Sequence, residues 1–119
     1  MLEFLLPPGL IDGEPLDWYA VVRPTEFRGT AYDGKPFSAA SGAEARILIL
    51  ESLDEGTAFV SRYAADFGYI TDTSYGSREE AIADCSSEFG DQLGTWTPIP
   101  DGVDHAETYV LSHLAKAGH

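Results

Sequence analysis

The chain has 119 residues, the size of one ordinary domain, and its 44% hydrophobic and 12% aromatic residues are enough to bury a core. Twenty acids against seven lysines and arginines give a formal charge of −13, which argues against a phosphate backbone or an anionic membrane as the partner. A single cysteine excludes an intrachain disulfide and favours a reducing cytoplasm.

Residues 1–17 are broken by prolines and glycines, so we expect an irregular lead-in to one domain that spans residues 1–119. The opening run MLEFLLPPG lacks a basic segment and is interrupted by Glu3, so no signal peptide is expected. No apolar stretch approaches the roughly eighteen residues that a membrane helix needs. The sequence therefore predicts a cytoplasmic protein that does not bind membranes.

Residues 18–23 (WYAVVR) are rich in aromatic and β-branched side chains and predict a first strand, which Pro24 ends. Residues 26–32 (EFRGTAY) predict a second strand, followed by a turn at 33–34 (DG) and a short return. The small and polar stretch 38–43 is expected to be a loop or an irregular edge.

The centre of the chain predicts three consecutive strands with short connections. Residues 45–50 (ARILIL) are almost continuously apolar, which is typical of a strand buried on both faces. A turn at 54–56 leads to a strand at 59–64 (FVSRYA), and a turn at 66–68 leads to a strand at 69–74 (YITDTS). We expect these three strands to form an antiparallel meander.

Residues 77–90 (SREEAIADCSSEFG) predict one helix with clear signals at both ends. Ser77 suits the N-cap, Glu80 completes a capping box three residues later, and Gly90 suits the end of the helix. Residues three and four apart form one apolar face that is expected to lie on the sheet. They are Ala81, Ile82, Cys85 and Phe89.

After this helix, residues 95–100 (TWTPIP) are expected to be extended, because their two prolines exclude a helix and a central strand. Asp101 or Asp104 can cap a last helix that runs to about Lys116. The predicted fold is therefore α+β: an antiparallel sheet of about four to six strands with two helices packed on it.

No residue pattern predicts catalysis, a cofactor or a metal site. His105 and His113 are about 12 Å apart on a helix, too far to share one ion. Cys85 lies on an apolar helix face with no evident base, which is typical of a core cysteine. Neither a glycine-rich phosphate-binding loop nor a calcium loop occurs. The residues favour a binding role over a catalytic one.

Acidic residues are unevenly spread, and no Lys or Arg occurs between residues 79 and 115. Glu80, Asp84 and Glu88 are four residues apart, so on a helix they form a stripe of like charges, and each pair costs roughly 0.2–0.5 kcal/mol. Capping accounts for Glu80, whereas Glu88 comes at the end of the helix, where the macrodipole disfavours negative charge. The stripe, extended by Asp91, is a candidate surface for a basic partner.

Two aromatic residues near this stripe, Phe67 and Tyr75, are expected to fall in turns, where burial is less automatic. Core packing is the competing explanation for both, since aromatic residues dominate small cores. An exposed aromatic beside an acidic stripe is the kind of residue that anchors a protein interface.

The run from Arg62 to Trp96, RYAADFGYITDTSYGSREEAIADCSSEFGDQLGTW, resembles a pattern in small uncharacterised bacterial proteins. The pattern is a hairpin, an acidic capped helix that ends in FG or YG, and then a Trp. In its small size, its acidity and its lack of motifs, the chain is also similar to immunity proteins, which neutralise antibacterial toxins. That resemblance implies an acidic surface that occludes the basic active site of a toxin.

The sequence thus favours a non-catalytic inhibitor or immunity-type protein that occludes a basic surface of a partner toxin or enzyme. Asp84, Glu88 and Asp91 would supply long-range attraction, and Phe67 or Tyr75 the desolvated anchor. A small enzyme with a concave pocket and an oligomerising module with a symmetric apolar face are the open alternatives. If the stripe is merely solvated, lysines in place of Asp84 and Glu88 leave stability unchanged or slightly higher.

Overall fold

The computed structural model describes residues 17–24, 38, 42–52, 56–100, 103 and 105–117. Three predicted features lie outside these residues: the lead-in through residue 16, the strand and turn expected at 26–34, and the helix cap expected at Asp101 or Asp104.

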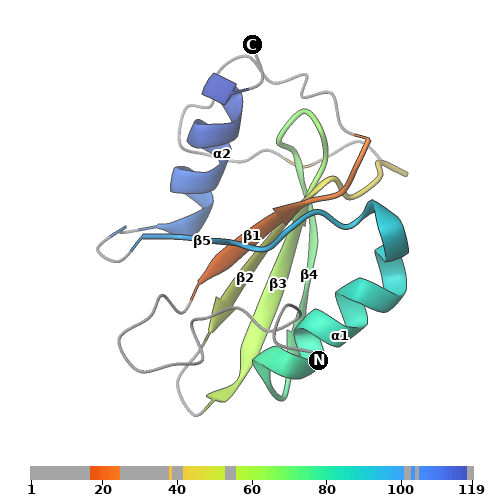
Figure 1. Ribbon diagram of the computed structural model, residues 1–119. Coiled ribbons are helices and arrows are strands. Elements are labelled where there is room, and N and C mark those ends of the chain that lie inside the picture. Colours follow the sequence, from red (N-terminus) through yellow and green to blue (C-terminus); the bar gives the residue numbers. More distant parts are fainter. Residues whose placement is uncertain are drawn as a thin grey trace.

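The described residues form one antiparallel sheet and two α-helices, in the α+β class that the sequence predicts (Figure 1). The strand order across the sheet is β4-β3-β2-β1-β5. The strands are β1 (Trp18–Val21), β2 (Ile47–Ser52), β3 (Ala58–Tyr63), β4 (Tyr69–Tyr75) and β5 (Thr97–Pro98). The helices are α1 (Arg78–Phe89) and α2 (Ala106–Ala117), and a short 3₁₀ turn, η4 (Gly90–Gln92), directly follows α1.

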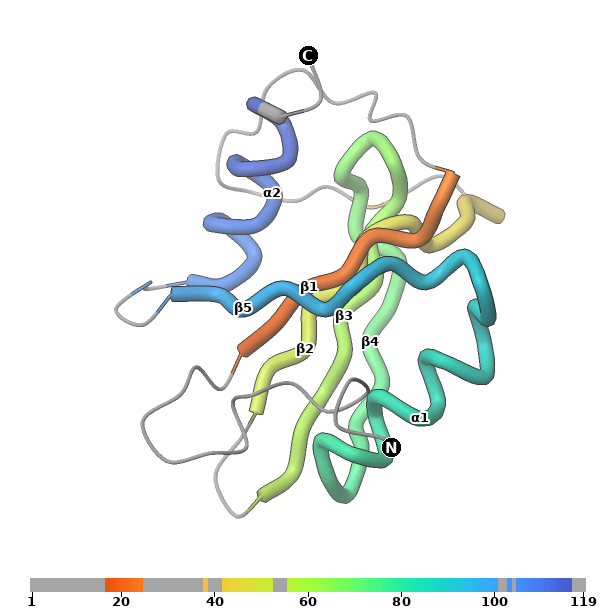
Figure 2. The backbone as a smooth tube through the Cα atoms, in the orientation of Figure 1, coloured from red at the N-terminus to blue at the C-terminus, as the bar shows by residue number. Residues whose placement is uncertain are grey.

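The two helices pack on opposite faces of the sheet, so the sheet is the middle of three layers (Figure 2). Side chains alternate between the two faces along a strand. Ile47 and Ile49 of β2 accordingly belong to the cluster under α2, whereas Leu48 and Leu50 belong to the cluster under α1. All four are fully buried, which explains the continuous apolar run of this strand and confirms the prediction that it is covered on both faces.

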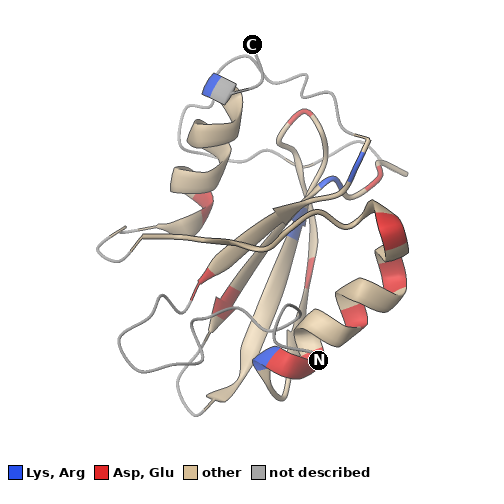
Figure 3. Cartoon of the chain, in the orientation of Figure 1, with Lys and Arg blue, Asp and Glu red and all other residues tan. Residues whose placement is uncertain are grey.

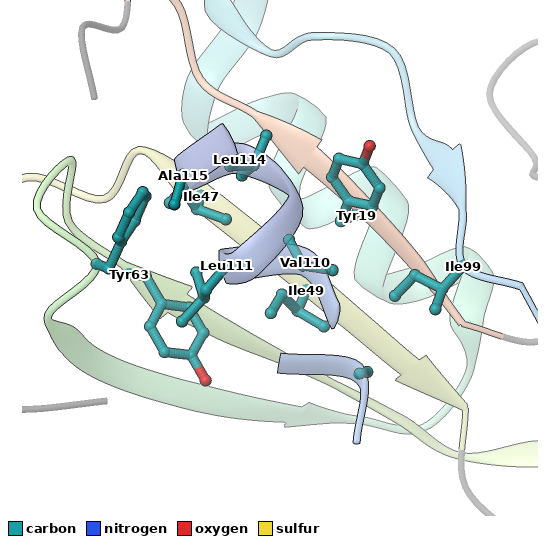
Figure 4. Packing of buried hydrophobic residues seen from close by; sticks show 11 residues of the cluster. Tyr19, Ile47, Ile49, Tyr63, Ile99, Val110, Leu111, Leu114 and Ala115 are labelled. Carbon is teal, nitrogen blue, oxygen red and sulfur yellow. The ribbon is translucent and has the colours of Figure 1, made fainter. Parts of the chain in front are cut away.

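Figure 4 shows the cluster under α2, which is the larger of the two described clusters. Val110 and Leu111 are the fully buried residues of α2, and Val110 lies against Ile49 of β2. The cluster extends sideways to Tyr19 on β1 and to Tyr63 on β3. Burying side chains of this size stabilises a fold by about 1.5–3 kcal/mol each, so this cluster holds α2 on the sheet.

The other face is covered by α1, as its apolar spacing predicts. Ala81, Ile82 and Cys85 are buried against Leu48 and Val60, and Phe89 packs partly buried at the edge of the same cluster. The cysteine is fully buried, which confirms its assignment to the core.

β5 is an edge strand that pairs only with β1 in the described sheet, in agreement with its prolines. The residues beside it close the two cores. Ile99 is 3% exposed in the cluster under α2, and Trp96 packs partly buried against the cluster under α1.

Candidate functional site

Acidic residues recur along the length of α1 and η4 (Figure 3), and their side chains are exposed to solvent. We call this surface the α1 acidic face; it consists of Glu79, Glu80, Asp84, Glu88 and Asp91. All five are exposed, whereas the buried side of the same helix is apolar. The structure therefore places on one helix and the turn after it all four acids that we propose from the sequence as a partner surface: Glu80, Asp84, Glu88 and Asp91.

Glu80 has the capping role that the sequence predicts. Ser77 is the N-cap, and its side-chain oxygen accepts a hydrogen bond from the Glu80 backbone N–H at 3.1 Å. The Glu80 carboxylate in turn accepts a hydrogen bond from the backbone N–H of Gly76 at 3.0 Å, one residue before the N-cap. Two backbone donors at the start of α1 are thereby satisfied.

Asp84 and Glu88 each accept a hydrogen bond from a residue of the sheet. The Tyr75 hydroxyl donates to Asp84 Oδ2 at 2.6 Å, and Arg62 Nη2 donates to Glu88 Oε1 at 3.2 Å. These contacts join β4 and β3 to the outer side of α1. The like-charge stripe therefore has a structural role that sequence spacing alone does not reveal.

Arg62 is the centre of this arrangement. Its register on β3 places it beside Leu48 of β2, and only 7% of its surface is exposed. Nη1 donates to Thr73 Oγ1 at 2.8 Å, and Nη2 lies 3.4 Å from the Tyr75 hydroxyl oxygen. Burial acts to lower the pKa of Arg62, but the contacts with Tyr75 and Glu88 outweigh it, so the net direction is upward. Glu88 thus neutralises a nearly buried cation.

Glu79 and Asp91 differ from the other acids of the face. Neither makes a hydrogen bond or an ion pair with any residue that the structure describes. Glu79 benefits from its place in the first turn of α1, where the macrodipole favours a negative charge. Asp91 lies in η4, beyond the end of the helix. Both carboxylates are directed to solvent and are available to a partner.

The proposal of Phe67 as an exposed anchor is wrong, because its side chain is 1% exposed in the cluster under α2. Its backbone has φ of 73°, a region that costs a non-glycine residue on the order of 1 kcal/mol. Burial of the phenyl ring outweighs this cost. The turn therefore directs Phe67 inward, which the turn signal at 66–68 does not reveal.

Tyr75 is the aromatic residue that does lie at the α1 acidic face. It is partly buried at the end of β4, and its hydroxyl lies between Arg62 and Asp84. Burial and the hydrogen bond to Asp84 raise the pKa of the phenol. The Tyr75 hydroxyl therefore acts as a hydrogen-bond donor in a fixed position, at the border between the core and the α1 acidic face.

The opposite face of the sheet carries a cavity of about 300 Å³ beside the start of α2. We call it the α2 pocket. Residues of β2, β3 and β4 line it together with His105 and the first residues of α2. The described lining residues are Glu51, Phe59, Ser61, Tyr63, Tyr69, Asp72, His105, Ala106 and Glu107.

Two tyrosines fix two of the three carboxylates in this pocket. The Tyr63 hydroxyl donates to Glu107 Oε2 at 2.7 Å, and the Tyr69 hydroxyl donates to Asp72 Oδ2 at 2.5 Å. The two rings contact each other edge to face, with centroids 5.7 Å apart. The tyrosines thus orient the acids and also form an aromatic wall.

Glu51, at the end of β2, is the third carboxylate, and it accepts no hydrogen bond from any described residue. Burial raises its pKa, and the negative charges of Asp17 and Glu107 raise it further, whereas His105 acts in the opposite direction. The described lining contains no Lys or Arg. The pocket therefore concentrates negative charge that no Lys or Arg of its described lining compensates.

The sequence analysis does not predict this pocket. Two features of the sequence belong to the pocket: a polar residue, Ser61, at a buried position of β3, and a carboxylate, Glu51, directly after a run of buried apolar residues. Both features need the register of three strands and the placement of α2 before they point to one location.

The two described histidines, His105 and His113, show no metal-binding arrangement. His113 is exposed and stacks on Tyr109 with centroids 5.9 Å apart, while His105 is exposed at the α2 pocket. Within the described part of the chain, no group of three or more His, Cys, Asp or Glu is placed to hold a metal ion. None of the described helices is both long enough and apolar enough to cross a membrane.

Comparison with known proteins gives no match: no family model, no curated protein and no solved structure is similar to the chain at a significant level.

Proposed function

We propose that this protein is a non-catalytic binding protein of the inhibitor or immunity type, and that it holds a basic protein surface through the α1 acidic face. The observation that carries the proposal is the arrangement of this face: five exposed carboxylates along the solvent-exposed surface of α1 and η4, three of them held by internal hydrogen bonds. A rigid set of charges loses less side-chain entropy on binding than a mobile one.

The roles within the face follow from the contacts. Asp84 and Glu88 have fixed positions and would set the register of a partner, because Tyr75 and Arg62 hold them. Glu79 and Asp91 have no internal partner among the described residues and would supply long-range attraction and rim contacts. Tyr75, partly exposed in the midst of these acids, is the aromatic contact in place of Phe67.

The formal charge of −13 supports the same reading, since a strongly acidic protein attracts basic surfaces and is repelled by nucleic acids. We propose the cytoplasm as the location and a basic toxin or enzyme as the partner, in line with the resemblance to immunity proteins. No binding to DNA or RNA is expected.

The test begins with affinity capture from the native cell and purification of the captured protein. Association rates are then measured at several salt concentrations for the wild type and for a Glu79→Gln/Asp91→Asn variant. Because rim charges act mainly on the association rate, the variant should bind several-fold more slowly at low salt and with a weaker salt dependence.

The matched control is a Glu44→Gln/Asp66→Asn variant, which removes the same amount of charge from residues outside both the α1 acidic face and the α2 pocket. Glu44 is exposed and pairs with Arg46 just before β2, and Asp66 lies in the turn between β3 and β4. This control should associate like the wild type. If instead the control binds slowly and the α1 variant binds normally, the α1 acidic face is not the contact surface.

A small enzyme is the second candidate function, because it requires a concave pocket with converging polar groups. The α2 pocket is such a cavity, and its raised Glu51 pKa is the kind of perturbation found at functional sites. A screen for turnover of cationic metabolites tests this candidate, and a Glu51→Gln variant is its control.

A further inference from the structure

We propose that the α2 pocket binds an organic cation, with an alkylammonium or guanidinium group seated among Glu51, Asp72 and Glu107. This site lies on the opposite face of the sheet from the α1 acidic face, and the inference does not depend on the function proposed for that face.

The size and walls of the pocket suit such a ligand. A cavity of about 300 Å³ is at the lower end of the range for small-molecule sites, so it fits one compact head group and a short chain. Phe59, Tyr63 and Tyr69 are aromatic lining residues, and aromatic faces attract cations by about 0.5–2 kcal/mol.

The hydrogen bonds leave acceptors free for the ligand. Glu107 and Asp72 each accept from one tyrosine hydroxyl, whereas a carboxylate has about four lone-pair sites. Glu51 accepts no hydrogen bond from the described residues, although burial already disfavours its charge. A bound cation would compensate this charge and satisfy these oxygens together.

Ser61 gives independent evidence that the pocket is built for a ligand. It is 7% exposed, it lines the cavity, and its hydroxyl makes no hydrogen bond with any described residue. The hydroxyl oxygen is not one of the fully buried polar atoms that lack a partner, so it is accessible from the pocket. A cationic donor in the pocket would supply a hydrogen bond to it.

An organic cation fits better than a metal ion. The acids are spread over the cavity, and no three metal-binding side chains of the described residues converge on one point. The aromatic walls also provide no ligand that a hard metal ion prefers. Charges distributed around an aromatic cavity instead match a head group with several N–H donors.

The test is a titration of the full chain with four probes: capped arginine amide, capped lysine amide, agmatine and putrescine. Capped glutamine amide is the uncharged control. Binding is followed by calorimetry and by backbone NMR shifts, which should move at Ser61, Asp72 and Glu107. We expect saturable binding of the cations and none of the amide control.

Two variants with the same charge change separate the pocket from general attraction. Glu51→Gln/Glu107→Gln should weaken binding at least about tenfold, whereas Glu79→Gln/Asp91→Asn on the other face should leave it nearly unchanged. Equal weakening by both variants, or no saturation up to about 10 mM probe, would overturn the inference. If the pocket variant does not fold, Glu51→Gln alone and Ser61→Ala provide the same comparison.

The probes also distinguish the source of the cation. Capped amides that bind as well as the free amines indicate a side chain of a protein partner. Free amines that bind at least about tenfold more tightly indicate a metabolite, because the capping groups then do not fit the cavity. Either result supports the site, and both are independent of whether the α1 acidic face binds a protein.

Discussion

Arg62 Nη2 lies 3.2 Å from Glu88 Oε1, and this ion pair connects the middle of the sheet to the last turn of α1. The Arg62 side chain is 8% exposed, whereas that of Glu88 is 46% exposed. The pair is thus half-buried and asymmetric: the cation has left water, and the anion has not. Glu88 is unfavourable for its own helix and favourable for the sheet beneath it.

Replacement of Glu88 should therefore cost more than replacement of an ordinary exposed acid. We expect Glu88→Ala to lower the free energy of unfolding by about 1–3 kcal/mol, because a nearly buried guanidinium loses its anionic acceptor. Glu79→Ala, at an exposed position without an internal contact, should change it by at most about 0.5 kcal/mol. Urea denaturation of the two variants makes the comparison.

Glu88→Lys should be more harmful still, because it places a second cation beside Arg62. This contact reverses the expectation from sequence that lysines in place of Asp84 and Glu88 leave the fold equally stable. Glu88→Ala and Glu79→Ala variants of equal stability would instead show that the Arg62–Glu88 pair contributes nothing, as many exposed pairs do.

Local signals in the sequence are sufficient for most of the fold. The run 45–50 predicts a strand buried on both faces, and β2 is that strand. Ser77, Glu80 and Gly90 predict the bounds of α1 because capping depends on residues within one turn of each other. The prolines of 95–100 predict an extended segment that is not a central strand, for the same local reason, and β5 lies at the edge of the described sheet.

The contacts of the two candidate sites depend instead on residues that are distant in sequence. Arg62 and Glu88 are 26 residues apart, and their contact requires the register of β3 and the rotation of α1 on the sheet. Tyr63 and Glu107 are 44 residues apart and meet only because α2 packs on the other face. The α2 pocket therefore has no signature in any single segment.

The thiol of Cys85 should react slowly in the native protein. It is fully buried, and burial, its largest influence, raises its pKa to about 11. A thiol reagent needs the exposed thiolate, so labelling should be slow in buffer and fast in denaturant. Rapid labelling of the native protein would mean that α1 does not cover Cys85 against the sheet.

Gly94 should tolerate no side chain, because the segment between η4 and β5 runs close beside β1 and is hydrogen-bonded to it. Its backbone N–H donates to the carbonyl oxygen of Val21 at 2.8 Å, and a Cβ on Gly94 would lie 2.7 Å from that oxygen. We expect Gly94→Ala to destabilise the protein by about 1–3 kcal/mol through this clash with rigid backbone.

Thermal melts measure this effect, and Thr95→Ala, at the next position, which is exposed, is the matched control. Equal melting temperatures for the two variants would contradict the close approach to β1.

Glu51 in the α2 pocket should make the protein less stable as the pH rises, and Glu51→Gln should remove this loss. Burial first, and then the negative charges of Asp17 and Glu107, raise the folded-state pKa of Glu51 above its ordinary value of 4.5, with His105 opposing them. The folded state therefore holds the proton more tightly than the unfolded state. The stabilisation that protonated Glu51 contributes is complete below pH 4.5 and is lost as the pH rises through the folded-state pKa.

Melting temperatures at pH 4 and pH 7 should show little effect of Glu51→Gln at the lower pH and a gain in stability at the higher pH. Glu79→Gln, outside the pocket, controls for the general relief of negative charge. A Glu51→Gln variant that is less stable at pH 7 would mean that the carboxylate supports the fold, and the uncompensated charge we assign to the α2 pocket would not exist.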